Sequence, residues 1–271
     1  MAEVDALVSP ADAPATPLPP LRFRWLPVWR RNSLVWRKLA IPSLLGNFGD
    51  PLLYLLALGY GLGALVGELE GMPYITFLAS GIVASSAMNT ATFEALYSAY
   101  TRMTQQQTWA GMLAAPLDVD DIVLGEMIWA GSKSVISAGA ILAVATLLGV
   151  VHGWSVIWII PIALLVGICF AAMALVVTSV SVSYDFFMYY FTLLITPMML
   201  FCGVFFPLSR LPDWVQTFAS FLPLTHAVWL IRPLATGKVP EHVLLSIFVL
   251  ATYAAVGFTL ATVLLRRRLR N

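Results

Sequence analysis

The chain has 271 residues, of which 60% are hydrophobic and only 11% are charged, and its mean hydropathy is +0.86. A single soluble core cannot hide so many apolar side chains, so the composition excludes a soluble globular protein and predicts an integral membrane protein. The formal net charge of +1 says little by itself, because in a membrane protein the placement of Lys and Arg carries the information. Cys169 and Cys202 lie in apolar stretches, which favours small buried side chains over a disulfide or a metal site.

The first forty residues divide into two parts. Residues 1–20 are rich in proline and lack a basic start and an apolar core, which predicts a disordered cytoplasmic tail and not a signal peptide. Residues 21–40 are rich in Arg and Trp, and winding them at about 100° per residue separates most of the apolar side chains from the cations. We expect an amphipathic interfacial helix that binds lipid and not nucleic acid. Its defining side chains are Trp29, Arg30, Arg31, Trp36 and Arg37.

Six apolar segments follow, each of at least about 20 residues, the length that spans roughly 30 Å of hydrocarbon. They are residues 41–66, 74–97, 122–150, 156–182, 186–206 and 243–265. Six Lys or Arg precede the first span and four follow the sixth, whereas the connection 67–73 has none and the long connection 207–241 has three. This distribution predicts that both termini are cytoplasmic. The predicted fold is therefore an all-α membrane protein with six transmembrane helices.

The connection between the second and third spans is placed in the cytoplasm by this topology. Residues 101–113, which precede Pro116, predict a short helix. The residues alone leave two interpretations open, a solvated connector between helices or a docking element for a cytoplasmic partner. Asp118 is expected to cap the third span, with Asp120 and Asp121 near the positive end of the helix dipole.

The connection between the fifth and sixth spans begins with helix-ending residues. Gly203, Pro207 and Pro212 interrupt the apolar run, and two segments of roughly ten residues, about half a bilayer in length, follow within 212–234. They predict a re-entrant or interfacial helical hairpin, and the residues do not choose between a hairpin that dips into the outer leaflet and one that lies along its surface.

Ionisable residues within the spans are expected to face protein, water or a membrane edge, because a charge in hydrocarbon is costly. Asp50, Glu94 and Glu126 lie near predicted cytoplasmic ends, which favours interfacial positions. Lys133 lies deeper, and we expect its amine to pair with an acidic group or to extend towards the interface. A direct role of Lys133 in transport is the alternative.

Two groups are candidates for contact with a substrate. The fifth span begins with an aromatic run that includes Phe187 and Tyr190. Aromatic rings can stack on sugar faces, although packing roles at the membrane boundary are more common. His226 and Arg232 lie in the outer hairpin, where they could meet a sugar or a phosphate, or hold the hairpin at the depth of the lipid headgroups.

Motifs for chemistry on this chain are missing. The sequence has no phosphate-binding Gly-x-x-x-x-Gly-Lys-Ser/Thr loop, no His-Glu-x-x-His motif, no Cys/His metal cluster and no nucleophile elbow. It also lacks the internal repeat with broken spans that is typical of secondary transporters. A chain of this kind that moves a large substrate would take its energy from ATP hydrolysis in another subunit.

Several runs resemble a known family. They are residues 201–212 (FCGVFFPLSRLP), 222–226 (LPLTH) and 231–234 (IRPL), supported by 50–55 (DPLLYL) and 115–117 (APL). These runs resemble the ABC-2 type transporter permeases, and the likeness is closest to the NodJ-type branch that exports lipooligosaccharide nodulation factors. The resemblance implies a permease subunit, not an enzyme, that moves an amphiphilic or lipid-linked saccharide outward across the bacterial inner membrane.

The resemblance also implies partners and site residues. It implies a homodimer with two cytoplasmic ATP-binding cassette subunits, which would bind ATP and Mg, and it implies no cofactor on this chain. Residues 101–113 then resemble the coupling helix, and residues 21–40 the gate helix, of a transmembrane domain that continues over residues 41–271. The implied ATPase-coupling residues are Glu94, Arg102, Gln105, Gln106, Trp109 and Leu113. The candidates for the substrate path or exit are Asn47, Asp50, Tyr54, Phe187, Tyr190, Phe205, His226 and Arg232.

Two other functions are carried as alternatives. A drug or antibiotic efflux permease of the same superfamily would share the architecture and differ only in its cargo. A membrane-embedded enzyme that acts on a lipid-linked sugar would need acidic or His side chains gathered at one membrane face, and Asp118, Asp120 and Asp121 are the candidates. Helix capping is the preferred interpretation of these three residues.

Overall fold

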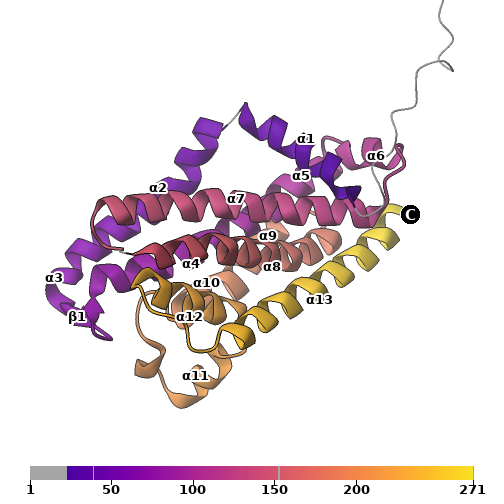
Figure 1. Ribbon diagram of the computed structural model, residues 1–271. Helices are drawn as coiled ribbons and strands as arrows, with labels where there is room; N and C mark the ends of the chain where they lie inside the picture. Colours follow the sequence, from indigo (N-terminus) through magenta and orange to yellow (C-terminus); the bar gives the residue numbers. More distant parts are fainter. Residues whose placement is uncertain (1–22, 39, 152, 271) are drawn as a thin grey trace, which may run out of the picture.

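The computed structural model describes residues 23–38, 40–151 and 153–270, with the side chains of residues 41, 43–48, 50 and 270 outside the described set. The predicted disordered tail, residues 1–20, lies outside the described residues. The described chain is almost entirely helical (Figure 1). Its long helices run side by side, and the C-terminus lies near α6 (Thr108–Leu113) at one end of the bundle, which we call the coupling end.

The elements follow one another in a simple order. The first half contains α1 (Trp25–Arg37), α2 (Ala40–Gly61), α3 (Gly63–Val66), β1 (Glu68–Leu69), β2 (Met72–Pro73), α4 (Tyr74–Phe93), η3 (Glu94–Ser98), α5 (Ala99–Thr104), α6 and α7 (Val119–Leu147). The second half contains η4 (Trp154–Trp158), α8 (Ile159–Val180), α9 (Asp185–Tyr190), η5 (Phe191–Ile195), α10 (Thr196–Phe201), η6 (Leu208–Arg210), α11 (Asp213–Ala219), α12 (Pro223–Ala235) and α13 (Val243–Arg270).

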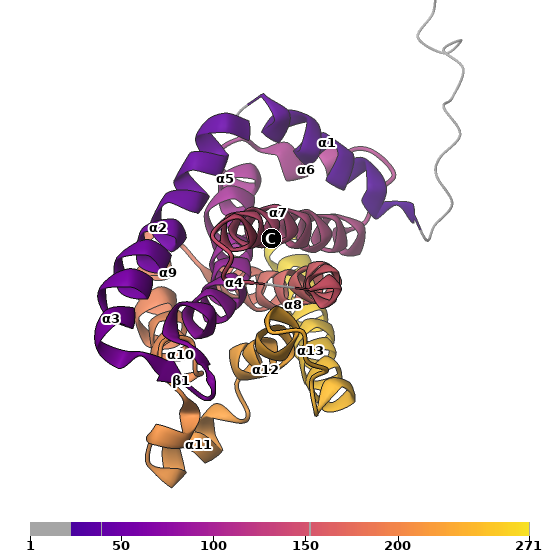
Figure 2. The ribbon, with the colours of Figure 1, turned by 60° about the vertical axis from the view of Figure 1, so that its left-hand side comes forward.

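Helix α4 is the centre of the bundle. It packs against α2, α7, α8 and α12, which surround it in Figure 2. Nearly all of its side chains are buried, and many are Ala, Ser or Thr. Small side chains let helix backbones approach closely, and their hydroxyls can bond within the helix or across to a neighbour. Ser86 in α4 and Ser137 in α7, for example, share a hydrogen bond of 2.7 Å between their hydroxyl oxygens.

Close contacts between small residues fix the neighbouring helices as well. A Cβ placed on Gly167 of α8 would lie 2.8 Å from Cα of Gly131 in α7, so a larger residue at either position would push the helices apart. A Cβ on Gly125 of α7 would lie 2.6 Å from Cβ of Val28 in α1. The same device therefore holds α1 against the transmembrane helices.

Two helices contain π-helical turns. Segment η3 continues α4 into α5, and η5 joins α9 to α10. The two segments lie close together, because the rings of Phe93, just before η3, and Phe191, in η5, are 4.6 Å apart. A π-helical turn adds one residue to the turn, so it changes which face of the following helix meets its neighbours.

The predicted spans correspond to helices with different ends. The first is divided at Leu62 into α2 and α3, and the second continues through η3 and α5 to Thr104. The third begins at Val119, as the predicted cap requires: Asp118 and Asp121 form a reciprocal capping box, and the backbone N–H of Asp118 donates to Oδ2 of Asp121 at 3.0 Å. The fifth was predicted to reach residue 206 but its last helix ends at Phe201, because Gly203 adopts a positive φ of 79°.

The count of six spans stays a prediction. Among the described residues, three helical segments are long and apolar enough to cross a membrane: Val119–Leu147, Trp154–Val180 and Val243–Leu269. Pro51–Val66 and Asp185–Phe201 are apolar but shorter. Helix α4 is long enough to span a membrane but is less apolar than these three helices. Its polar side chains suit a position that is covered by protein on all sides.

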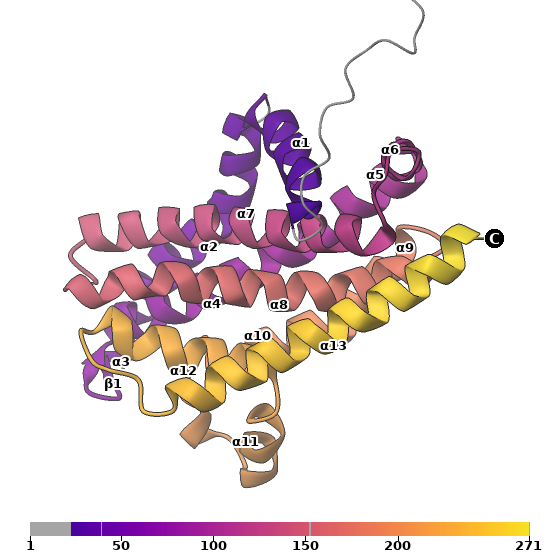
Figure 3. The ribbon, with the colours of Figure 1, turned by 45° about the vertical axis from the view of Figure 1, so that its right-hand side comes forward.

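The predicted helical hairpin consists of α11 and α12, which are bent by 89° relative to one another. Helix α12 packs against α4, α8 and α13 and extends past Pro233 to Ala235, beyond its predicted end. Helix α11 lies outside the bundle (Figure 3), with Trp214 75% exposed. The two halves of the hairpin therefore have different environments, and re-entry into the membrane stays a prediction.

Candidate functional site

Four charged side chains meet between η3, α5 and α7, and we call Glu94, Arg102, Glu126 and Lys133 the charged cluster. Arg102 donates from Nε to Oε1 of Glu126 at 3.0 Å and from Nη2 to Oε2 of Glu126 at 2.5 Å. The same Nη2 also donates to Oε1 of Glu94 at 2.8 Å. Nζ of Lys133 donates to Oε2 of Glu94 at 2.8 Å. Two cations and two carboxylates thus form one connected network.

Three uncharged donors complete the coordination of the two carboxylates. The indole Nε1 of Trp129 donates to Oε1 of Glu94 at 2.9 Å. Nε1 of Trp109 donates to Oε1 of Glu126 at 3.2 Å, and Nδ2 of Asn32 donates to Oε2 of Glu126 at 3.1 Å. Every carboxylate oxygen in the charged cluster therefore accepts at least one hydrogen bond, as buried polar atoms require.

The charged cluster is buried and depends on its pairing. Glu94 is 4% exposed, Glu126 is 2% exposed and Arg102 is 9% exposed. Burial disfavours the charged forms of these groups, and their direct ion pairs offset that cost. Removing one partner from such a buried pair costs about 3–5 kcal/mol, because the other charge is left without compensation.

The charged cluster connects elements that are far apart in the sequence. Asn32 belongs to α1 and Trp109 to α6, and both bind the Glu126 carboxylate of α7. Arg31 of α1 also donates from Nη2 to Oγ1 of Thr108 in α6 at 3.3 Å. In Figure 1 these elements lie together at the coupling end of the bundle. The gate-helix and coupling-helix predictions thus fall on two elements that the charged cluster joins.

Helix α1 is further held by two of its tryptophans. Nε1 of Trp29 donates to Oγ of Ser132 in α7 at 3.0 Å. The ring of Trp36 lies edge-on to the ring of Trp129, with 6.0 Å between centroids. A cavity of about 220 Å³ remains beside the charged cluster, and α1 forms one of its walls. Arg30 and Arg37, the other predicted gate residues, are exposed.

The predicted coupling residues fall into two groups. Glu94, Arg102 and Trp109 are buried in or against the charged cluster, and the expectation that Glu94 and Glu126 lie at the depth of the membrane interface stays a prediction. The predicted segment 101–113 is also divided, because its first four residues complete α5 and only Thr108–Leu113 forms the short helix α6. The remaining members differ in exposure: Gln105 and Gln106 are exposed, whereas Leu113 is half-buried.

A second cavity, of about 260 Å³, opens on the side of the bundle between α2, α4, η5 and α10, and we call it the lateral pocket. Tyr54 and Phe205, two predicted path residues, line it with ring centroids 6.3 Å apart. Its wall also carries polar side chains from α4 and α10. These are Ser85, Ser86, Asn89, Thr90 and Thr196.

Of the other predicted path residues, Phe187 and Tyr190 do not line the lateral pocket. Phe187 is fully buried, with its ring centroid 5.1 Å from that of Tyr97, so it packs inside the subunit and is not presented to a substrate. Tyr190, in the same helix α9, is half-buried. Asn47 and Asp50 belong to α2, but their side chains lie outside the described residues.

His226 and Arg232 belong to α12, and their side chains have structural partners outside that helix. His226 is 2% exposed, and its Nε2 and Nδ1 lie 2.9 Å from the carbonyl oxygen of Ser220 and 3.2 Å from Oγ of Ser246. Arg232 donates from Nη2 to the carbonyl oxygen of Gly203 at 2.6 Å, and its guanidinium lies 3.6 Å above the ring of Phe77. His226 is therefore a packing residue, whereas Arg232 also lines an open cavity.

Sequence reasoning missed Asn32 and Trp129 as members of this site. A signal for Trp129 was available, because Glu126, Trp129 and Lys133 are spaced by three and four residues and so share one face of a helix. Asn32 lies on the arc of α1 that also carries the tryptophans, but nothing in the sequence indicates that this polar residue meets Glu126, 94 positions away.

Comparisons with known proteins agree on one family. The model of the ABC-2 type transporter family matches residues 24–234. Nodulation protein J of Bradyrhizobium diazoefficiens is 48% identical over 258 residues, which are 95% of this chain and 98% of that protein. Nodulation protein J of Rhizobium leguminosarum bv. viciae is 46% identical over 252 residues, 93% of this chain and 97% of that protein. Nodulation protein J of Rhizobium meliloti is 45% identical over 252 residues, 93% and 96% of the two chains.

Proposed function

The chain belongs to the ABC-2 type transporter family, and on this premise we propose that it is the permease subunit of an exporter of an amphiphilic or lipid-linked saccharide. The cargo would move outward across the bacterial inner membrane. Two separate cytoplasmic ATP-binding cassette subunits would hydrolyse ATP with Mg, and a second copy of this chain would complete the pathway. Both termini would lie in the cytoplasm, as the distribution of Lys and Arg suggests.

The observation that carries the proposal is the way α6 is held. One face of α6 directs Trp109 into the bundle, where it binds the Glu126 carboxylate. The other face presents Ala110 and Gly111, next to the exposed Gln105 and Gln106. Small and uncharged side chains on this face suit insertion into a groove of a partner. A displacement of α6 by an ATPase would be transmitted directly to α7. Through Arg102 it would also reach the continuous helix formed by α4, η3 and α5.

The lateral pocket supports an amphiphilic cargo. Hydroxyl and amide side chains of α4 line the pocket together with aromatic side chains of α2 and of the segment after α10, so it offers partners both for sugar hydroxyls and for apolar groups. The relatives named nodulation protein J match nearly the full length of the chain, which supports a lipooligosaccharide as the cargo class. In a homodimer, this side of α2 and α10 would face the second copy.

The geometry disfavours the enzyme alternative. Asp118 and Asp121 are engaged with each other at the start of α7, and Oδ2 of Asp120 lies 2.5 Å from Nη2 of Arg266 in α13. These carboxylates therefore have structural roles that account for their presence. A drug efflux permease remains the alternative in cargo, and the transport assay below separates the two.

The test is transport by purified components. The chain and its cognate ATPase are reconstituted into proteoliposomes, and accumulation of a fluorescent lipooligosaccharide is measured with ATP, without ATP and with a hydrophobic drug as competitor. We expect accumulation that requires both ATP and the ATPase. Transport that persists without the ATPase, or transport of the drug alone, would contradict the proposal.

A pair of variants tests the docking role of α6. Ala110→Arg places a large cation on the exposed face of α6, and Thr217→Arg makes a comparable change on the exposed surface of α11. We expect Ala110→Arg to abolish co-purification of the ATPase and transport, and Thr217→Arg to retain co-purification. Equal co-purification by the two variants would show that α6 does not dock.

A further inference from the structure

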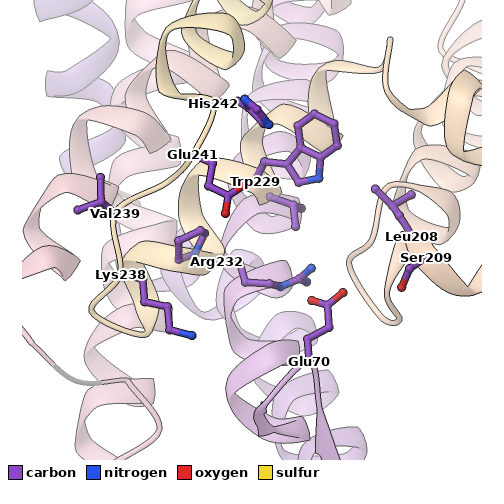
Figure 4. Close-up of a pocket in the computed structure, with 11 residues that line it drawn as sticks. Glu70, Leu208, Ser209, Trp229, Arg232, Lys238, Val239, Glu241 and His242 are labelled. Atoms are coloured by element: carbon purple, nitrogen blue, oxygen red, sulfur yellow. The ribbon is translucent and has the colours of Figure 1, made fainter.

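A third cavity, of about 470 Å³, lies at the end of the bundle opposite the coupling end, and we call it the hairpin pocket. It is bounded by the β1–β2 hairpin, by α12 and by the connection from α12 to α13 (Figure 4). Its volume is within the range of roughly 300–1,000 Å³ that is typical of small-molecule sites. The polar and aromatic side chains that line it include Glu70, Ser209, Trp229, Arg232, Lys238 and Glu241.

The hairpin directs Glu70 into this pocket at a conformational cost. Glu70 and Gly71 form the turn and have φ angles of 53° and 73°, the two positive values that a two-residue type I′ turn requires. Glycine, Asn and Asp favour such positions, and Glu does not. Figure 4 shows the Glu70 carboxylate turned towards the guanidinium of Arg232 across the pocket. Because strained backbone positions cluster at binding sites, this conformation makes Glu70 a candidate ligand-binding residue.

The charges around the pocket are only loosely matched, because Glu70 interacts electrostatically with Arg232 but is not in direct contact with it. Among the residues that the structure describes, the side chains of Glu70, Lys238 and Glu241 form no ion pair and no hydrogen bond. Arg232 is fixed by Gly203, by Oγ of Ser80 at 3.1 Å and by the ring of Phe77. The pocket therefore presents carboxylate acceptors and cationic donors from different sides, with one of the donors held rigidly in place.

This combination of groups discriminates between ligand classes. An anion such as a lipid phosphate would benefit from Arg232 and Lys238 but would be repelled by two carboxylates. A neutral saccharide can use both signs, because its hydroxyls donate to carboxylates and accept from cations. The half-buried ring of Trp229 adds an aromatic surface of the kind on which the apolar face of a sugar stacks.

We propose that the hairpin pocket binds a neutral saccharide unit through Glu70, Arg232, Lys238 and Glu241, with Trp229 as its stacking surface. The proposal rests on the proposed function, since it assigns to the pocket the sugar part of the exported cargo. In the orientation proposed above, the pocket opens on the outer side of the membrane. Binding of the saccharide in this pocket would oppose its return into the transport pathway.

Binding to the full-length chain in lipid nanodiscs tests this assignment. Maltotetraose and chitotetraose are the neutral probes, inorganic phosphate and vesicles of phosphatidylglycerol are the anionic probes, and binding is measured by saturation-transfer NMR and calorimetry without ATP. We expect a neutral tetrasaccharide to bind and Glu70→Gln and Glu241→Gln each to weaken binding roughly tenfold, because each removes a charged hydrogen-bond acceptor. Trp229→Leu should weaken it similarly.

Two matched controls distinguish the pocket from the surface around it. Glu68→Gln changes an exposed carboxylate on the same hairpin, and Trp214→Leu removes an exposed indole from α11, and neither residue lines the pocket. Both variants should bind the tetrasaccharide as the wild type does. Equal losses in the control and pocket variants, no binding of either tetrasaccharide, or binding of the anionic probes alone would overturn the assignment.

Transport measured in parallel separates this assignment from the proposed function. If the wild type exports the fluorescent lipooligosaccharide but binds no tetrasaccharide, the pocket assignment fails and the transport function stands. If the pocket variants lose tetrasaccharide binding but the wild type shows no ATP-dependent export, the transport function fails and the pocket assignment stands.

Discussion

The charged cluster and the hairpin pocket contain similar side chains and use them in opposite ways. In the charged cluster, both carboxylates and Arg102 are buried, Lys133 is half-buried, and every carboxylate oxygen accepts a hydrogen bond. In the hairpin pocket, the side chains of Glu70, Lys238 and Glu241 are exposed and, within the described part of the chain, form no direct ion pair. Burial forces charges to satisfy one another, whereas exposure leaves them available to a ligand. The first region is suited to transmit movement and the second to bind.

The largest expected effect is on the charged cluster. Glu126→Ala removes the acceptor of Arg102, Asn32 and Trp109, so we expect the free energy of unfolding to fall by about 3–5 kcal/mol. SDS-induced unfolding of the detergent-solubilised protein, followed by circular dichroism, measures the change. Glu68→Ala, at an exposed position in the hairpin, is the control and should unfold as the wild type does. A similar stability for both variants would remove the distinction between the two regions.

Lys133→Met should have a smaller effect on the same network. It removes one donor from Oε2 of Glu94, while Arg102 and Trp129 still donate to Oε1. Because a hydrogen bond to a charged group contributes about 1.5–3 kcal/mol, we expect a loss within that range in the same unfolding measurement. Lys133→Arg keeps the charge and should recover part of the loss. A loss as large as that of Glu126→Ala would mean that the network is organised around Lys133.

Trp109→Phe tests whether the charged cluster transmits movement. The ring is kept and the indole N–H that binds Glu126 is lost, but Nε of Arg102 still donates to the same carboxylate oxygen, so stability should fall by only about 0.5–1.5 kcal/mol. We expect the number of cargo molecules moved per ATP hydrolysed to fall severalfold, because α6 would no longer be tied to α7. The ratio is measured in proteoliposomes that contain the ATPase. An unchanged ratio would assign α6 to docking alone.

The smallest expected effect is in the hairpin pocket. Lys238→Gln changes an exposed side chain that has no partner among the described residues, so the free energy of unfolding should change by less than about 0.5 kcal/mol. The same SDS titration measures it. A loss of more than 1 kcal/mol, on the order of a buried hydrogen bond, would show that the pocket is a structural feature and not an open site.

The sequence was sufficient for features that depend on local composition. Apolar runs located the long helices, Asp118 marked the beginning of α7, and Gly203 was identified as a helix-ending residue, although the fifth span was predicted to extend to residue 206. Each of these follows from a side chain or a backbone preference that acts within one turn. The position of α12 against α4 and α8 could not be predicted, because packing between helices depends on their shapes over the whole contact.

The charged cluster illustrates the other limit. The sequence predicted an acidic partner for Lys133 but did not identify Glu94 as that partner, and the members of the network come from helices that are distant in the sequence. Pairing depends on how α4, α7 and α1 turn relative to one another, and composition carries no information on those rotations. The π-helical turn η3 is a further reason. No residue pattern predicts this turn, yet it determines the direction in which the side chain of Arg102 points.

Segment η3 also places a constraint on the length of the chain. One residue more or fewer between Glu94 and Arg102 would turn everything that follows by about 100° and carry the guanidinium away from both carboxylates. Many substitutions within 95–101 keep this distance along the chain, whereas a single insertion or deletion changes it. Among natural variants of this protein, the second span should therefore tolerate changes of residue far better than changes of length.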